Sequence, residues 1–172
     1  MSDEDAAWVL GRTPALNVAW AALQSGNRQW VGGHEEAAIA QWSEIAKKYR
    51  GSDAAQAAWS HLGQVARYRG DIAGSTKAYK SLLETLDPPK HASMFPFFDY
   101  ANYKHKACIE LSDMSIESHD LRGALKYATL ARDEHTFSAM CGTAAFGTDW
   151  EIRTRIESLH QAISERRAVR LK

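Results

Sequence analysis

The stretch Gln56–Pro89, QAAWSHLGQVARYRGDIAGSTKAYKSLLETLDPP, decides the fold. It is predicted to form two helices joined by a tight turn at Arg69-Gly70-Asp71. Each helix carries small and apolar residues at three- and four-residue steps, so each has one face to bury. In the first helix these are Ala55, Ala58, Trp59, Leu62, Gly63 and Ala66, and in the second Ile72, Tyr79, Leu82, Leu83 and Leu86. We expect the two faces to meet across Gly63, where the missing side chain lets the backbones approach.

This helical hairpin resembles a tetratricopeptide repeat, a family with the pattern W-x2-L-G-x2-Y, then A-x3-F, then P. The matching residues are Trp59, Leu62 and Gly63, with Tyr79 at the Phe position. The departures are Ala66 at the Tyr position, Ser75 at the Ala position and Pro88, which comes one place late. The resemblance implies a fold of stacked helix pairs and a general mode of action, binding, without naming a partner.

A first, degenerate repeat is expected over residues 15–50. Thr13-Pro14 is typical of a helix start, because the N–H that proline lacks is not needed in the first turn. This helix ends either at Gly26-Asn27 or further on, at Trp30. A second helix is expected over about 35–49, and either Ser52 or Asp53 caps the helix after it.

The family resemblance of this first hairpin lies in a few positions. Ala38 and Trp42 imitate the A-x3-F pair of the second helix. In the first helix Trp20 and Leu23 fit the first half of W-x2-L-G, while Gln24 replaces the glycine. The second repeat then covers residues 54–89.

A third repeat is expected over residues 96–134, after a stiff connector that contains Pro88 and Pro89. An over-long helix is predicted from near Pro96 to about Glu117, and a second helix follows from Asp120. Cys108, Leu111 and Ser112 occupy the Trp, Leu and Gly positions, and Ala124, Ala128 and Ala131 the small-residue positions. The aromatic cluster over residues 95–103 is either core or a recognition surface.

The last helix is expected over residues 149–168, after an irregular loop over 135–147. Thr148-Asp149-Trp150-Glu151 has the form of a capping box, in which side chains bond the first backbone N–H groups. One apolar stripe follows, made of Trp150, Ile152, Ile156, Leu159 and Ile163. A repeat array needs such a helix, polar on its outer side, to seal its last face.

Together these elements predict an all-α fold without strands. About three antiparallel helix pairs stack in a right-handed superhelix, and the C-terminal helix caps it. An acidic N-terminal lead-in over residues 1–13 precedes a single domain over residues 14–172.

The charge balance predicts neither a nucleic-acid nor a membrane partner. The chain has 21 Lys and Arg against 21 Asp and Glu, so no overall field concentrates polyanions. The N-terminus has no signal-peptide pattern, and no apolar run approaches the ~20 residues that span a bilayer. The two cysteines, Cys108 and Cys141, lie in different elements, so a cytoplasmic protein with reduced thiols is expected.

The resemblance implies a concave groove, lined by the first helix of each pair, that binds a peptide or helix of another protein. The positions carried over from the family are Ser60, Gln64 and Arg67 on the second repeat, and Asn102, Lys106 and Asp113 on the third. A family subclass clamps a terminal carboxylate with Lys and Asn. Ser60 and Gln64 stand at those places, which disfavours that function. The protein is then an adaptor, assembly factor or regulatory subunit, and homo-oligomerisation through its Trp-bearing N-terminus is an alternative.

No catalytic residue, metal site or cofactor is predicted. The seven histidines are scattered, and the nearest ligand group is Asp133, Glu134, His135 and Cys141, without a second nearby cysteine. A Cys141 nucleophile with His135 as base lacks a recognisable oxyanion hole. The alternative from another class is a small helical enzyme or ligand-binding protein that uses the 95–103 segment and the 135–147 loop.

Overall fold

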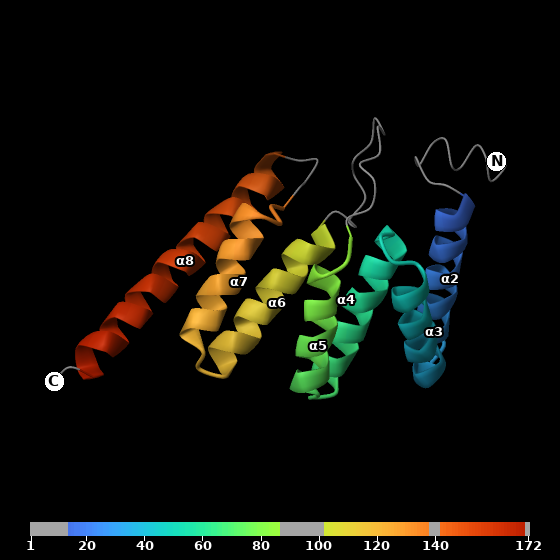
Figure 1. Ribbon diagram of the computed structural model, residues 1–172, viewed down its shortest axis with the longest axis horizontal. Helices are drawn as coiled ribbons and strands as arrows, with labels where there is room; N and C mark the ends of the chain where they lie inside the picture. The colour runs from blue at the N-terminus through green and yellow to red at the C-terminus, as the bar shows by residue number, and fades with distance from the viewer. Residues whose placement is uncertain (1–13, 87–101, 138–141, 171–172) are drawn as a thin grey trace. The chain divides into compact units, whose positions relative to one another are not determined.

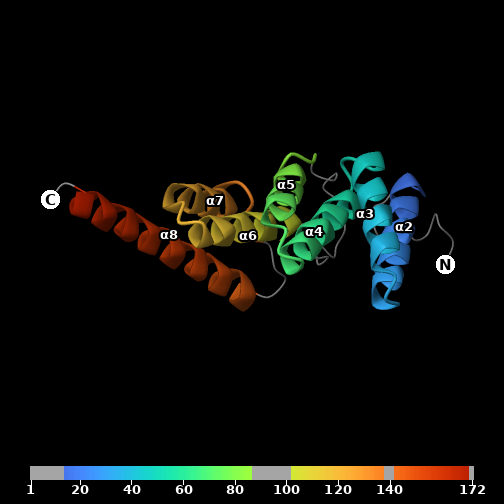
Figure 2. The same ribbon diagram turned by 90° about the horizontal axis from the view of Figure 1, so that it is seen from below.

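The computed structural model describes residues 14–86, 102–137 and 142–170, and every regular element in these ranges is an α-helix. The helices are α2 (Pro14–Val31), α3 (Glu35–Lys48), α4 (Asp53–Tyr68), α5 (Ile72–Leu83), α6 (Tyr103–Glu117), α7 (Leu121–Asp133) and α8 (Gly142–Arg170). Figure 1 and Figure 2 show them from two sides. The predicted all-α class is therefore confirmed for the described part of the chain.

The chain divides into two compact units, residues 1–103 and 104–172. The first contains α2 to α5, and the second contains nearly all of α6 together with α7 and α8. A single domain over residues 14–172 stays a prediction.

Three helix pairs, α2–α3, α4–α5 and α6–α7, are joined by the same turn. Its central residue has a positive φ, at Gly33 (79°), Gly70 (76°) and His119 (61°). The N–H of this residue donates to the carbonyl three residues earlier, at 2.9–3.0 Å. The next N–H donates to the carbonyl five residues earlier, at 2.8 Å in all three turns. This is the Schellman arrangement that ends many helices, so the three hairpins repeat one local design.

Of these three residues, His119 is the one that is not a glycine, and its backbone adopts the left-handed conformation nevertheless. We expect His119→Gly to raise the free energy of unfolding by about 0.5–1 kcal/mol, because the strain removed exceeds the added freedom of the unfolded glycine. Urea denaturation followed by circular dichroism measures this change. Gly70→Ala is the matched reverse change and should lose about 1 kcal/mol, since it puts a Cβ on a positive φ. A less stable His119→Gly would show that contacts of the imidazole outweigh the backbone strain.

The predicted contact of the central hairpin at Gly63 is confirmed. A Cβ at Gly63 would lie 2.7 Å from Cε1 of Tyr79, whose side chain is 1% exposed. Beside it, the Ser75 hydroxyl donates to the Gly63 carbonyl at 2.9 Å. In the third hairpin the direction is reversed. Ser112 of the first helix donates its hydroxyl to the carbonyl of Ala124 of the second helix at 3.0 Å. Both pairs are twelve residues apart, so they occupy equivalent positions in their two hairpins.

The first hairpin has its close contact at Gly26, and the predicted register with Gln24 at the glycine position is wrong. Gly26 lies twelve residues before Ala38, as Gly63 lies twelve before Ser75. A Cβ on Gly26 would come within 2.7 Å of Nε1 of Trp42. The physical reason is the Trp42 ring, which needs a residue without a side chain beneath it. Of the two ends considered for this helix, the later one holds, since α2 continues through Gly26 to Val31.

Helix α4 is buried on more than the one face expected from its spacing. Ala54 and Ala57 are as inaccessible as Ala55 and Ala58, because α4 packs against α2, α3 and α5 together. It begins with Ser52 as its N-cap, whose hydroxyl accepts the N–H of Ala55.

The apolar face of α5 is shorter than predicted. Tyr79 and Leu82 are buried, but Ile72 is 45% exposed and Leu86 is 72% exposed. Ile72 is the first residue of the helix and has no preceding turn to cover it. Leu86 follows the end of the helix at Leu83, so helical spacing does not govern its direction.

In the second unit α6 begins at Tyr103, and the over-long helix expected from near Pro96 stays a prediction. The segment before it, residues 87–101, lies outside the described residues. Within α6 and α7 the predicted small and apolar positions are buried as expected; these are Cys108, Leu111, Ser112, Ala124, Ala128 and Ala131.

The predicted start of the last helix is also wrong. Helix α8 begins at Gly142, so Thr148–Glu151 lies inside the helix and forms no capping box, and residues 142–147 are not loop. Ile152, Ile156 and Leu159 are buried as predicted, whereas Trp150 is 62% exposed. Trp150 precedes Ile152 by two residues, which places the two on opposite sides of a helix.

Candidate functional site

Two hollows on the first unit share the side chain of Trp59. One, of about 350 Å³, is lined by Ala46, Lys47, Arg50, Trp59, Ser81, Glu84, Thr85 and Leu86. The other, of about 270 Å³, is lined by Ile39, Trp59, Leu62, Val65, Ala66, Arg69, Asp71, Gly74, Lys77 and Ala78. We call the residues of both lists the Trp59 groove. Its walls are α3 and α5, and its floor is α4, which lies between them in both ribbon views (Figure 1, Figure 2).

The shape of the groove follows from helical spacing and small side chains. Its α5 wall runs from Gly74 to Glu84, which is about three turns or ~15 Å of helix. Ala46 on α3 and both Gly74 and Ala78 on α5 leave space where longer side chains would fill it. Each hollow is therefore bordered by at least one small side chain.

Trp59 gives the groove its apolar floor, together with half-buried Ile39 and Leu62. Trp59 was predicted on the apolar face of its helix, yet it is only half-buried. An indole that is partly covered in the free protein has surface left to bury against a partner, and Trp is enriched among the residues that dominate binding energy.

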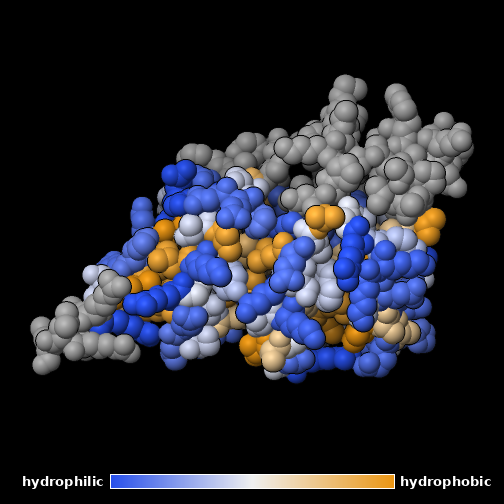
Figure 3. All heavy atoms as spheres, in the orientation of Figure 1, coloured by the Kyte–Doolittle hydropathy of each residue, from blue (hydrophilic) through white to orange (hydrophobic). Residues whose placement is uncertain are grey.

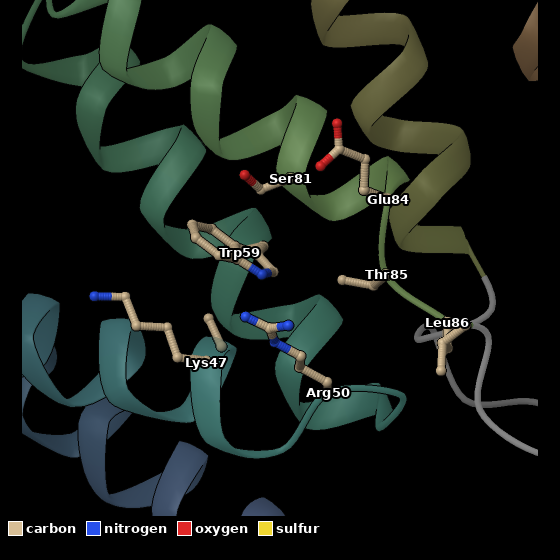
Figure 4. A pocket seen from close by; sticks show the side chains of 8 residues that line it. Lys47, Arg50, Trp59, Ser81, Glu84, Thr85 and Leu86 are labelled. Carbon is tan, nitrogen blue, oxygen red and sulfur yellow. The ribbon is translucent and has the colours of Figure 1, made fainter.

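The rims of the groove are cationic. Lys47, Arg50 and Lys77 are exposed, and none of them forms an ion pair with another described residue. Glu84 is the lining carboxylate that no hydrogen bond or ion pair engages within the described ranges. In Figure 4 the Arg50 guanidinium is turned toward the indole of Trp59, and Glu84 stands on the α5 wall.

The other two charged residues of the groove are already engaged. Arg69 bridges Glu35 at 2.8 Å and Glu36 at 2.9 Å, and these two hydrogen-bonded carboxylates raise the pKa of its guanidinium. The Asp71 carboxylate caps α5 by accepting the N–H of Gly74 at 2.8 Å. Arg69 is paired with two carboxylates, so the remaining lining charges are the cations Lys47, Arg50 and Lys77 against the carboxylates Glu84 and Asp71.

The predicted binding residues on α4 and α6 have different surroundings from those expected. Ser60 is 3% exposed and Asn102 is 4% exposed, so neither offers surface to a partner. Transferring the family's binding positions to this chain assumed that this face of each helix is exposed to solvent. Helix α4 instead packs against three other helices. Gln64 and Lys106 are exposed and Arg67 is half-buried.

Asp113, the last of the predicted residues, forms an ion pair with Arg155 of α8. Its carboxylate is therefore used within the second unit. Ser60, Gln64, Arg67 and Asn102 lie in the first unit, whereas Lys106 and Asp113 lie in the second. The groove beside Trp59 was not predicted from the sequence. The sequence signal that could have indicated it is the pair of lysines, Lys47 and Lys77, on the helices before and after that of Trp59.

His61 belongs to α4, and its ring lies against that of Trp42, with centroids 4.8 Å apart and planes tilted by 34°. Burial lowers the pKa of His61 below its ordinary value of 6.5, and a hydrogen bond with Gln64 opposes this in part. The ring is therefore neutral at neutral pH and adds no cation to this unit.

The second unit shows no arrangement suited to catalysis among its described residues. Burial raises the pKa of the Cys108 thiol to about 12, so this cysteine is protonated and inert. His105 is held by its Nδ1, which lies 2.8 Å from the carbonyl oxygen of His135. The nearby hollow, which His105, Thr136 and Asp149 help to line, measures about 20 Å³ and has room for water only.

The residues of the predicted alternative sites lie partly outside the described ranges, including Cys141 and residues 95–101. Asp133 is paired with Arg132 at 2.6 Å, and this contact lowers the pKa of the Asp133 carboxyl. Across the described ranges no three His, Cys, Asp or Glu side chains are placed to share a metal ion.

The surface is a mosaic of hydrophilic residues with smaller apolar patches between them on the face shown in Figure 3. None of the described helices combines the length and the apolar character that crossing a membrane requires. Comparison of the chain with protein-family models, with curated proteins and with solved structures finds no match in any of the three.

Proposed function

We propose that this chain is a non-catalytic interaction module of the tetratricopeptide type, and that its Trp59 groove holds a segment of another protein. The proposal rests on one observation above all. Two hollows meet at a half-buried tryptophan, and three of the lining cations, Lys47, Arg50 and Lys77, form no ion pair with another described residue. Partly covered aromatic anchors with a charged rim are typical of protein-binding surfaces.

Three further features support the family assignment within this proposal. The helix pairs share one turn, the small positions twelve residues apart recur in each pair, and the aromatic side chains of Trp42 and Tyr79 lie against glycines. Repeats of this kind stack into arrays, so a right-handed superhelix capped by α8 belongs to the proposal. The described hollow beside His105 in the second unit, at about 20 Å³, gives the alternative of an enzyme no comparable support.

The proposal is tested with peptides selected from a random displayed library against the full chain. We expect most selected peptides to bind about tenfold more weakly, or worse, to Trp59→Ala, because interface tryptophans often contribute more than 1 kcal/mol. Ser81→Tyr, which fills the groove without removing a buried group, should weaken the same peptides. Fluorescence anisotropy measures the affinities, and circular dichroism checks that each variant is folded.

The matched control is a variant with both Gln64→Ala and Lys106→Ala, which changes the exposed positions of the originally predicted binding face. Its affinities should equal those of the unchanged protein. Peptides that lose affinity for this control but keep it for Ser81→Tyr would place binding on the other face and overturn the Trp59 site. Failure to select any peptide that is sensitive to either variant would overturn the proposed function.

A further inference from the structure

We infer that the occupant of the Trp59 groove is an amphipathic α-helix whose apolar stripe is bordered by acidic side chains. This inference rests on the proposed function and specifies the chemistry of the partner. It follows from the shape of the walls, from the spacing of the two hollows and from the charges on the rims.

The walls favour a helix over an extended peptide. Both walls are helices, and the small residues Ala46, Gly74 and Ala78 let another helix backbone approach closely. An extended peptide usually gains affinity by adding to a sheet edge, and the described residues contain no strand to offer one. Helices in grooves instead use side chains at i, i+3, i+4 and i+7, which need no free backbone groups from the receptor.

The two hollows match the anchors of such a helix. They lie on either side of Trp59, and the groove extends over about three helical turns, or ~15 Å. Apolar residues one turn apart on a partner helix are separated by about 5 Å along its axis, so two or three of them fit within this length. One anchor would enter each hollow, and the indole of Trp59 would pack between them.

The charges favour acidic residues on both sides of the partner's apolar stripe. Lys47 and Arg50 belong to the α3 wall and its end, while Lys77 stands on the α5 wall beside the other hollow. The cations therefore face a bound helix from both walls. Charges of this kind contribute more to the rate of association and to the choice of partner than to raw affinity. These three cations outnumber the two lining carboxylates, Glu84 and Asp71, so a helix with basic borders should bind more weakly.

The inference is tested with three synthetic peptides of about 18 residues, a length at which helices become stable enough to study. The first has leucines at i, i+3, i+4 and i+7 with glutamates at their borders. The second has lysines in place of those glutamates. The third has the composition of the first, with a central proline that breaks the helix. Binding to the full chain is measured by calorimetry at low and at high salt.

We expect the acidic helix to bind about tenfold or more tightly than the basic one, with the difference shrinking at high salt. The proline peptide should show no measurable binding. Lys77→Glu should weaken the acidic helix, while Lys80→Glu, a change of an exposed lysine on the same helix but outside the groove, should not. Trp59→Ala should weaken the acidic helix at either salt concentration.

The outcomes separate this inference from the proposed function. Equal or tighter binding of the basic helix overturns the acidic occupant, and undiminished binding of the proline peptide overturns the helical one. In both cases the groove itself stands if library-selected peptides still depend on Trp59. Absence of Trp59-dependent binding in the synthetic set and in the library overturns both.

Discussion

Replacing Gly63 by alanine is expected to lower the free energy of unfolding by about 2–3 kcal/mol. The new Cβ would lie 2.7 Å from Cε1 and 2.8 Å from Cζ of Tyr79, closer than carbon atoms approach without repulsion. Tyr79 is 1% exposed, so its ring cannot turn into solvent to relieve the contact. Helix α4 or the ring must shift, and the Ser75 hydrogen bond to the Gly63 carbonyl would be strained with it.

The matched control for this prediction is Gly147→Ala. Gly147 also lies inside a helix, α8, but a Cβ there meets nothing within 4 Å. Alanine has the higher helix propensity, so this variant should gain about 0.5–1 kcal/mol. Urea denaturation of the two variants should therefore give changes of opposite sign. A Gly63→Ala protein as stable as the unchanged one would show that the hairpin does not depend on this close contact.

A second variant tests the cause of the loss. Tyr79→Leu removes the ring atoms that the new Cβ would strike, so in this background Gly63→Ala should cost clearly less. An unchanged cost would assign the effect to the backbone of α4 instead of the ring. The double-mutant cycle thus separates packing from helix propensity.

The hairpin and its turn were predictable from the sequence because the signals are local. Arg69-Gly70-Asp71 combines a residue free to adopt positive φ with a side chain able to cap the next helix, and both do so. The same turn at His119 has no glycine, and the hydrogen bonds of its neighbours hold it nevertheless. Helix starts and ends were predictable where they depend on such residues. The start of α8 was not, because its position does not depend on the capping box at Thr148.

The candidate site was less predictable because a groove depends on what the helices leave uncovered. Ser60 reads as an exposed polar residue in sequence, and the packing of α4 among three helices buries it. Trp59 reads as core, and it stays half-exposed because the small residues Ala46 and Ala78 do not cover it. Which side of a helix stays open is decided by the spacing of its neighbours, and no local pattern encodes that spacing.

Replacing Trp42 by alanine is expected to cost about 3–5 kcal/mol, the largest loss of stability among the changes considered. Its side chain is 2% exposed and lies in the core of the first unit, with Trp30 at 5.6 Å and His61 at 4.8 Å between ring centroids. Its Nε1 donates to the Asn27 side-chain oxygen at 3.0 Å. Alanine would leave a cavity that these neighbours cannot close, while phenylalanine keeps part of the packing and should cost less.

Trp42 also decides the register of the first hairpin, which a cycle with Gly26 tests. Gly26→Ala alone should cost about 2 kcal/mol, because its Cβ would meet Trp42 Nε1 at 2.7 Å and Cδ1 at 2.9 Å. Trp42→Ala removes the ring atoms that the new Cβ would meet, so Gly26→Ala should cost less in that background. Gln24→Ala, at the position that the sequence pattern favours, should change stability little, since exposed or half-buried substitutions of this kind are nearly neutral. A neutral Gly26→Ala with a costly Gln24→Ala would restore the register read from Trp20 and Leu23 and contradict the packing of α2 on α3.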